Sequence, residues 1–219
     1  MSLFRKCLFA SSFILSVFVS CKEKPSTSAT TAPTQRAGDT SATSTPITPV
    51  IEDNNIYADV DISPMDMSYF PTKYPQQKIA DPTVPPPVMR VIYSRPHLQG
   101  RKLFEEILKY GQTWRLGANE ATELDVFQPV TIGDKKLPVG RYTLYAIPKA
   151  GYWTIAINND LDLWGLKQDV SKDLVRVEVP VSYYNPIMEY FTMVFEKSDT
   201  GANLIIAWDD ALVKLPVKI

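Results

Sequence analysis

The chain has 219 residues, of which 45% are hydrophobic and 21% are charged, as in ordinary globular proteins. Its formal net charge is −1 and it has no long basic stripe, which argues against a nucleic-acid partner. With one histidine and two cysteines it lacks the side chains for a His/Cys metal site, and no dinucleotide or phosphate-loop motif predicts a cofactor.

The first 20 residues have the pattern of a cleaved export signal. Arg5 and Lys6 form a short positive region, and a run of thirteen mainly apolar residues follows over 7–19. A membrane-spanning helix needs about 20 apolar residues, so this run fits the hydrophobic core of a signal peptide. The end of the run, Phe18-Val19-Ser20-Cys21, resembles a bacterial lipobox, with Phe18 in place of the usual leucine.

Cys21 is the predicted lipidation site. Cys7 leaves with the signal, so Cys21 is the sole cysteine of the mature chain and has no internal disulfide partner. Acyl chains on its thiol would anchor the protein to a membrane. Lys22 follows instead of the aspartate of inner-membrane retention, which favours the outer membrane, on its periplasmic or surface face. Lys22-Glu23-Lys24 is similar to surface-export signals of Bacteroidota lipoproteins. The alternative is an ordinary secretory signal that contains a cysteine.

Residues 21–55 are predicted to be the lipidated cysteine and a disordered tether. This stretch is rich in Ser, Thr, Ala and Pro and has no aromatic residue. Such a composition cannot bury enough apolar surface to offset its chain entropy. Aromatic residues and strand-like alternation begin at Ile56, so residues 56–219 are predicted to form the globular domain.

The domain is predicted to be all-β. Short runs rich in Val, Ile, Tyr, Phe and Thr recur between turn residues, which is typical of an antiparallel β-sandwich or a barrel. We expect a β-sandwich of about eight strands, at residues 88–93, 121–127, 141–147, 153–158, 174–180, 189–196, 203–208 and 212–217.

One short helix is expected over residues 102–110. Leu103, Ile107 and Tyr110 share a face at helical spacing, and Gly111 provides a stop. The proline-rich residues 56–87 are expected to lie in extended form over a sheet edge, where they would protect it from pairing.

The residues between Tyr93 and Thr122 contain the candidate binding site, of which His97, the only histidine, is one member. Arg95, Arg101 and Arg115 would form a cationic pocket for a carboxylate or phosphate, because guanidinium presents a planar fork of donors. Trp114 and Tyr93 would stack on a ligand ring, and Asn119 and Glu120 would hold hydroxyl groups. These residues fit an acidic glycan or a small anion. The alternative is structural: arginines that bind loop carbonyls, a tight turn at Asn119 and a Trp114 in the core.

The same stretch allows two catalytic alternatives. His97, the only histidine, would act as a base toward Ser94, but the spacing is poor and no third member is evident. A glycan hydrolase needs only two carboxylates, and Glu120, Glu123 and Asp125 lie close in sequence. On a strand, Glu123 and Asp125 would face the same side.

The run YSRPHLQGRKLFEEILKYGQTWRLGANEATEL, together with SPMDMSYFP and LPVGRYTLYAIP, resembles an uncharacterised bacterial family, the domain of unknown function 2911. The resemblance covers roughly residues 59–219. The chain departs from the family pattern at Glu105 and Lys109, where the local helix or loop is expected to differ from that of the family. It supports the fold and the exported location and implies no reaction.

We therefore expect an outer-membrane-anchored lipoprotein whose sandwich binds a ligand or an envelope protein partner. A carboxylate-dependent glycan hydrolase of the cell envelope is the alternative.

Overall fold

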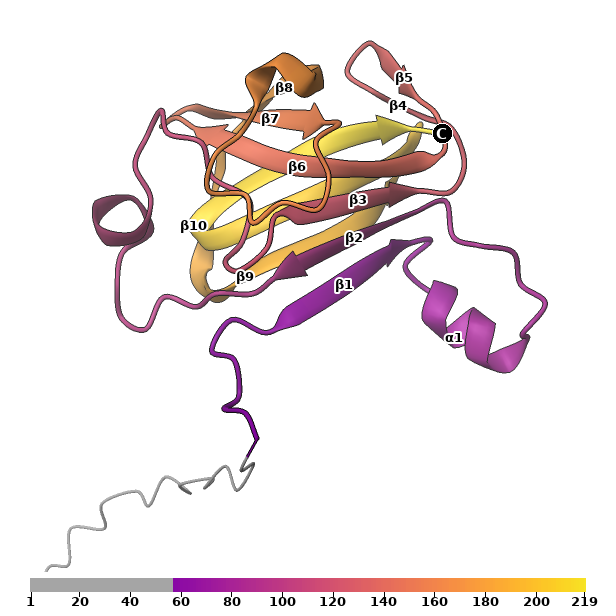
Figure 1. Cartoon of the computed structure of the whole chain (residues 1–219), viewed down its shortest axis with the longest axis horizontal. Coiled ribbons are helices and arrows are strands. Elements are labelled where there is room, and N and C mark those ends of the chain that lie inside the picture. Colours follow the sequence, from indigo (N-terminus) through magenta and orange to yellow (C-terminus); the bar gives the residue numbers. More distant parts are fainter. Residues whose placement is uncertain (1–56) are drawn as a thin grey trace, which may run out of the picture. The chain divides into compact units, whose positions relative to one another are not determined.

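The computed structural model of the protein describes residues 57–219, which form two antiparallel β-sheets packed face to face (Figure 1). This arrangement confirms the predicted all-β sandwich. The predicted signal peptide, Cys21, the tether and Ile56 lie outside the described residues. Within residues 57–219, no helix has the length and apolar character needed to cross a membrane.

The larger sheet has six strands in the order β1-β2-β3-β6-β7-β8, and all neighbours are antiparallel. Its side chains alternate between a buried inner face and an outer face, as a half-buried strand requires. The strands are β1 (Met65–Phe70), β2 (Met89–Ser94), β3 (Thr122–Val126), β6 (Gly140–Pro148), β7 (Tyr152–Asn158) and β8 (Asp173–Pro180).

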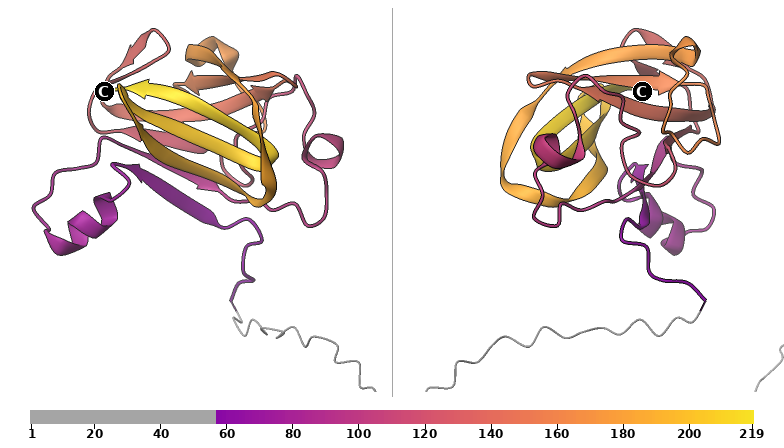
Figure 2. Two further views of the ribbon diagram at one scale, coloured as in Figure 1. Left: turned by 180° about the vertical axis from the view of Figure 1, so that it is seen from behind. Right: turned by 60° about the vertical axis from the view of Figure 1, so that its left-hand side comes forward.

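The smaller sheet has four strands in the order β5-β4-β10-β9 (Figure 2). They are β4 (Val130–Ile132), β5 (Lys135–Leu137), β9 (Ser182–Ser198) and β10 (Gly201–Lys218). The prediction of separate strands at 203–208 and 212–217 is wrong, because β10 runs through both. Asp209 interrupts the pairing at this point with a φ of 55° and register shifts on either side of it. The strand bends at this residue and continues, whereas the sequence pattern predicts two separate strands.

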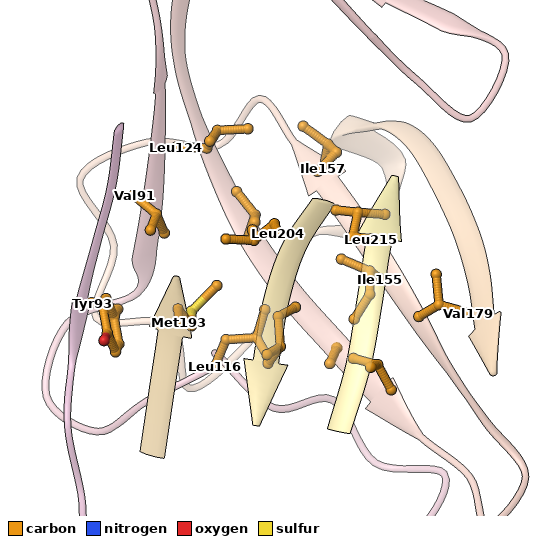
Figure 3. Packing of buried hydrophobic residues seen from close by; sticks show 14 of the residues in the cluster. Val91, Tyr93, Leu116, Leu124, Ile155, Ile157, Val179, Met193, Leu204 and Leu215 are labelled. Carbon is orange, nitrogen blue, oxygen red and sulfur yellow. The ribbon is translucent and has the colours of Figure 1, made fainter. Parts of the chain in front are cut away.

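The core lies between the two sheets. Apolar side chains from both inner faces meet there, as Figure 3 shows for Val91 and Leu124 of the larger sheet and Leu204 and Leu215 of the smaller one. At one end the core becomes aromatic: the Trp114 ring lies 4.9 Å from Phe191, 5.7 Å from Trp208 and 5.8 Å from Trp153. Aromatic groups contribute large buried area and mutual ring contacts.

The two sheets are joined along one edge by the chain that follows β2. Phe191 donates its N–H to the carbonyl of Pro96 (2.9 Å), and Leu98 donates to the carbonyl of Glu189 (3.0 Å). The chain therefore leaves the larger sheet at Ser94 and pairs directly with β9. After this crossing, His97 lies next to β9. The segment that forms the candidate site begins here.

The helix predicted over 102–110 is instead a single turn, the π-helix Leu103–Ile107. Leu108 N–H closes it on the carbonyl of Leu103 (2.7 Å), and the chain continues extended toward Gly111. In residues 56–87, the extended course holds for β1, which pairs with β2 along its full length. It is wrong for α1 (Tyr74–Ala80), a short helix with Pro75 in its first turn.

The loop 159–172 covers the outer face of the larger sheet. Thr143 donates to the carbonyl of Asp160 (2.5 Å) and Asn158 to that of Asp169 (2.9 Å), so Tyr145 beneath the loop is fully buried. Tyr145 donates its hydroxyl to Asp173 Oδ2 at 2.7 Å. Burial, assisted by this hydrogen bond, raises the pKa of Tyr145 to about 12.

This tyrosine predicts a loss of stability at alkaline pH. An unfolded tyrosine ionises near pH 10, so between pH 10 and 12 the unfolded chain holds fewer protons than the folded one. The free energy of unfolding is then expected to fall with rising pH, by up to about 2 kcal/mol for this group. Urea unfolding at pH 9 and pH 11.5 checks it. Tyr145→Phe should flatten this part of the pH dependence, and an unchanged slope in the variant would contradict it.

Candidate functional site

The structure places part of the predicted cluster around a pocket of 400 Å³, here called the arginine pocket. Its charged side chains are Arg101 and Arg115, and no carboxylate from residues 57–219 lines it. Its other lining residues are Ile62, Ser63, Pro96, Ile107, Leu108, Thr113, Trp114, Gly117, Ala118, Gly165, Leu166 and Trp208. A concave, mainly apolar surface with a few polar groups is the usual form of a small-molecule site.

Arg115 is held in the pocket wall by the strand-like segment around it. Trp114 exchanges two backbone hydrogen bonds with Ala146 of β6, both at 2.8 Å, which fixes this segment to β6 beyond the end of β3. Trp114 and Leu116 on either side point into the core and are buried. Alternation along the chain therefore turns Arg115 away from the core and toward the pocket.

The guanidinium of Arg115 has an unusual environment. Its Nε is buried and has no hydrogen-bond partner among the residues that the structure describes. Burial lowers the pKa of Arg115, and the negative charge of nearby Glu120 partly opposes this effect. A buried donor without a partner costs free energy, and the cost is larger for a charged group. An anionic ligand at the part of Arg115 that lines the pocket would offset the electrostatic part of this cost.

Arg101 lies at the pocket mouth and is fixed by its own backbone. Its Nε donates to the carbonyl of Leu98 (2.8 Å) and its Nη2 to that of His97 (3.0 Å). These bonds hold the side chain in one place before any ligand arrives. Arg101 therefore supplies a preorganised second positive charge beside Arg115.

Trp114 forms the floor of the arginine pocket together with Trp208, and only 7% of its surface is exposed. Its Nε1 donates to the carbonyl of Gly117 (3.1 Å), while the Nε1 of Trp208 donates to that of Glu189 (3.1 Å). Both indoles thus satisfy their N–H groups inside the protein. They present apolar surface to the pocket.

Asn119 positions the rim of the pocket. It adopts the left-handed conformation, with a φ of 55°, which asparagine tolerates. Its side-chain amide donates to Asp61 (2.7 Å) and to the carbonyl of Ser63 (3.2 Å), and so it holds Ile62 at the mouth. Glu120 is exposed and does not line the pocket.

Ser94 and His97 do not form the catalytic pair that the sequence left open. The Ser94 hydroxyl donates to the carbonyl of Ala118 and accepts the N–H of the same residue (2.7 Å), so it fixes the turn at Gly117. His97 stacks on Tyr190 at a ring distance of 5.1 Å, with its Nδ1 3.8 Å from Glu189. Both side chains are engaged in holding segments together.

Arg95 is also separated from the arginine pocket. Its guanidinium donates to Asp66 (3.1 Å), to Thr192 Oγ1 (3.2 Å) and to the carbonyl of Phe191 (3.2 Å). It therefore ties β1 to β9 across the sandwich edge. The three arginines that are close in sequence divide into one structural residue and two pocket residues.

Replacing Arg95 with glutamine is expected to lower the free energy of unfolding by about 1–2 kcal/mol. The side chain is one-third exposed, so the ion pair with Asp66 adds little, and most of the loss comes from the bonds to β9. Binding in the arginine pocket should be unchanged in this variant. Chemical denaturation together with a ligand titration checks both parts, and a stability equal to that of the parent chain would contradict the structural role.

The acidic residues near the site are mostly paired. Glu123 and Asp125 lie on the same outer face of β3, as predicted, and there they accept hydrogen bonds from Arg141 (2.7 Å) and Arg90 (2.5 Å). They do not face a second carboxylate across a cleft. A different set, Glu105, Glu189, Asp209 and Asp210, lines a pocket of 510 Å³, here called the acidic pocket, and Arg101 lines both pockets.

Three of the four carboxylates of the acidic pocket already have structural bonds. Asp209 accepts the N–H of Leu103 (3.1 Å) and caps the π-helix, while Glu105 pairs with Lys102 (3.0 Å). Glu189 accepts the N–H of Gln99 at 2.8 Å. Asp210 has no hydrogen bond or ion pair with the described part of the chain. Among residues 57–219, no group of three or more His, Cys, Asp or Glu side chains is placed to hold a metal ion.

Outside residues 93–122, sequence reasoning missed five lining residues of the arginine pocket: Ile62, Ser63, Gly165, Leu166 and Trp208. They come from three distant segments, and no local pattern connects them to Arg115. The only local signal is the glycine at 165, whose φ of 78° marks a special turn.

A family model described as a protein of unknown function (DUF2911) matches residues 75–217. This range includes both arginines of the arginine pocket and excludes Ile62 and Ser63 at its rim. No curated protein and no solved structure matches the chain.

Proposed function

This chain belongs to the DUF2911 family of proteins of unknown function, and on that premise we propose that its sandwich domain binds a small anionic ligand in the arginine pocket. We further propose that Cys21 carries a lipid that anchors the protein to the outer membrane. The protein would then act as a binding protein of the cell envelope rather than as an enzyme.

The observation that carries the binding proposal is that Arg115, whose buried Nε has no hydrogen-bond partner within residues 57–219, lines a pocket to which no described carboxylate contributes. Ordinary surface arginines, such as Arg141 with Glu123 and Asp162, pair with acids of their own chain. Arg115 and Arg101 leave the arginine pocket with net positive charge. A carboxylate or phosphate would accept hydrogen bonds from the parts of these guanidinium groups that line the pocket, and charge-assisted bonds of this kind are the stronger ones.

The envelope location is supported by the sequence. The positive residues, the short apolar run and the lipobox-like Phe18-Val19-Ser20-Cys21 together fit an export signal with lipidation. Metabolic labelling with a fatty-acid analogue tests it: the parent chain should become labelled, and Cys21→Ala should not. A labelled Cys21→Ala chain would overturn the lipid anchor.

Replacing Arg115 with glutamine tests the binding proposal. The full-length chain is titrated with benzoate and, separately, with inorganic phosphate, and binding is followed by calorimetry. We expect at least one of these anions to bind, and the variant to bind it about 10–100 times more weakly, because one hydrogen bond to a charged group contributes about 1.5–3 kcal/mol.

The matched control is Arg176→Gln. This arginine pairs with Asp173 at 2.6 Å on the outer face of β8, far from the arginine pocket in the sheet order. The substitution Arg176→Gln removes the same charge and should leave anion binding unchanged. Equal weakening in both variants would show a general charge effect, and no binding of either anion would overturn the proposal.

The acidic pocket supports the second candidate, a carboxylate-dependent glycan hydrolase. Asp210, whose carboxylate has no hydrogen bond or ion pair within residues 57–219, lines this pocket together with Glu189 and two tyrosines, Tyr110 and Tyr183. Two acids at a suitable separation are sufficient for glycoside hydrolysis. Incubation with purified peptidoglycan tests it. Sugar release that is lost in both Asp210→Asn and Glu189→Gln would support this candidate, and no release by the parent chain would reject it.

A further inference from the structure

We infer that the ligand of the arginine pocket is an amphiphilic carboxylate, with its acidic group at Arg115 and an apolar chain directed toward the rim. This inference rests on the proposed function and names the class of ligand for the same site. It departs from the acidic glycan that the sequence suggested.

The arginine pocket combines polar and apolar surface in about equal parts. Ile107, Leu108, Trp114 and Trp208 contribute to the apolar part. Because both indole N–H groups are bonded to carbonyls of the protein, these two rings offer no hydrogen-bond donor to a ligand. The apolar part of the pocket therefore gains free energy from apolar contact and gains none from hydroxyl groups.

Two exposed apolar side chains also line the arginine pocket. Ile62 is 69% exposed and Leu166 is 71% exposed. The bonds of Asn119 to Asp61 and to the carbonyl of Ser63 fix the chain on either side of Ile62, and Gly165, with a φ of 78°, precedes Leu166. Two apolar side chains at a cationic pocket provide contact for a chain that leaves the acidic group.

A sugar acid fits this site less well. Within residues 57–219, the polar side chains that line the pocket besides the two arginines and the two bonded indoles are Ser63 and Thr113. A sugar acid carries several hydroxyl groups, and each one that is buried without a partner costs free energy. An alkyl or aryl carboxylate has a single polar end, which matches the single cationic region around Arg115 and Arg101.

A series of carboxylates on the full-length chain tests the inference. Acetate, hexanoate and octanoate share one head group and differ in chain length, glucuronate adds hydroxyl groups, and octanol removes the charge. Hexanoate is expected to bind at least 10 times more tightly than acetate, since each methylene that is removed from water changes affinity by about fourfold. Glucuronate and octanol should bind much more weakly than octanoate.

Two rim variants make the test specific. Ile62→Ser and Leu166→Ser should each weaken octanoate at least threefold and leave acetate unchanged. Val139→Ser is the matched control, because Val139 is 60% exposed and does not line the arginine pocket. It should leave octanoate binding unchanged.

The outcomes separate the inference from the proposed function. Anion binding that depends on Arg115 but is equal for acetate, octanoate and glucuronate would overturn the amphiphilic ligand and leave the anion site standing. Octanoate binding that is unaffected by Arg115→Gln would overturn both, because it would show apolar contact alone.

Discussion

Replacing Trp208 with alanine is expected to lower the free energy of unfolding by about 3–5 kcal/mol. Only 1% of this side chain is exposed, and its ring lies 5.7 Å from Trp114 and 5.8 Å from Phe191. Its removal leaves a cavity beneath the arginine pocket and leaves the carbonyl of Glu189 without its indole donor. Urea denaturation gives the loss directly.

Trp164→Ala is the matched control for Trp208→Ala, since the same side chain is removed from a residue that is 55% exposed. It should change the free energy of unfolding by less than about 0.5 kcal/mol. Trp208→Phe should lie between the two, because it keeps a ring in the aromatic cluster and loses the N–H. A loss below about 2 kcal/mol in Trp208→Ala would show that the cluster is not part of the folded core.

Replacing Gly165 with alanine is expected to cost about 2–4 kcal/mol and to weaken ligand binding. The residue has a φ of 78°, which costs an L-residue about 1–2 kcal/mol. An added Cβ would also lie 2.9 Å from the Cβ of Ala121 and 3.0 Å from the Cβ of Arg115. Since this packing has no free space, the loop or the backbone of Arg115 must shift, at about 1–3 kcal/mol.

Gly111→Ala separates the two causes. Gly111 has nearly the same φ, 79°, but an added Cβ there would meet nothing within 4 Å. This control should lose about 1–2 kcal/mol and bind benzoate and octanoate as the parent chain does. Equal losses in the two variants would mean that the backbone conformation alone matters and that Gly165 does not set the position of Arg115. Denaturation and calorimetry on both variants provide the comparison.

Which of the arginines is structural and which lines the pocket depends on contacts between residues that are far apart in the chain. Arg95 and Arg115 look equivalent in sequence, since both follow a strand-like segment close to a turn. Arg95 meets Asp66 and the backbone of β9, whereas the Nε of Arg115 meets no partner among residues 57–219. Which arginine is available to a ligand is therefore decided by the surrounding strands.

The sequence alone predicts the all-β sandwich and most of its strands, because the side-chain period of two is a local property. The same local signal fails at two places. The segment at 102–110 has helical spacing, but its residues close only one π-turn, capped by Asp209 from β10. The strand β10 reads as two strands because Asp209 breaks the period, while pairing with β9 continues on both sides.

The sequence also singles out residues 93–122 as the candidate site, with two arginines that line the arginine pocket. Only the tertiary structure joins them to Ile62, Leu166 and Trp208, which lie up to about 100 positions away in the chain. Sequence carries the local preferences of each segment. The partners of each side chain follow from long-range packing, and that packing decides that Arg95 is structural while Arg115 faces a pocket.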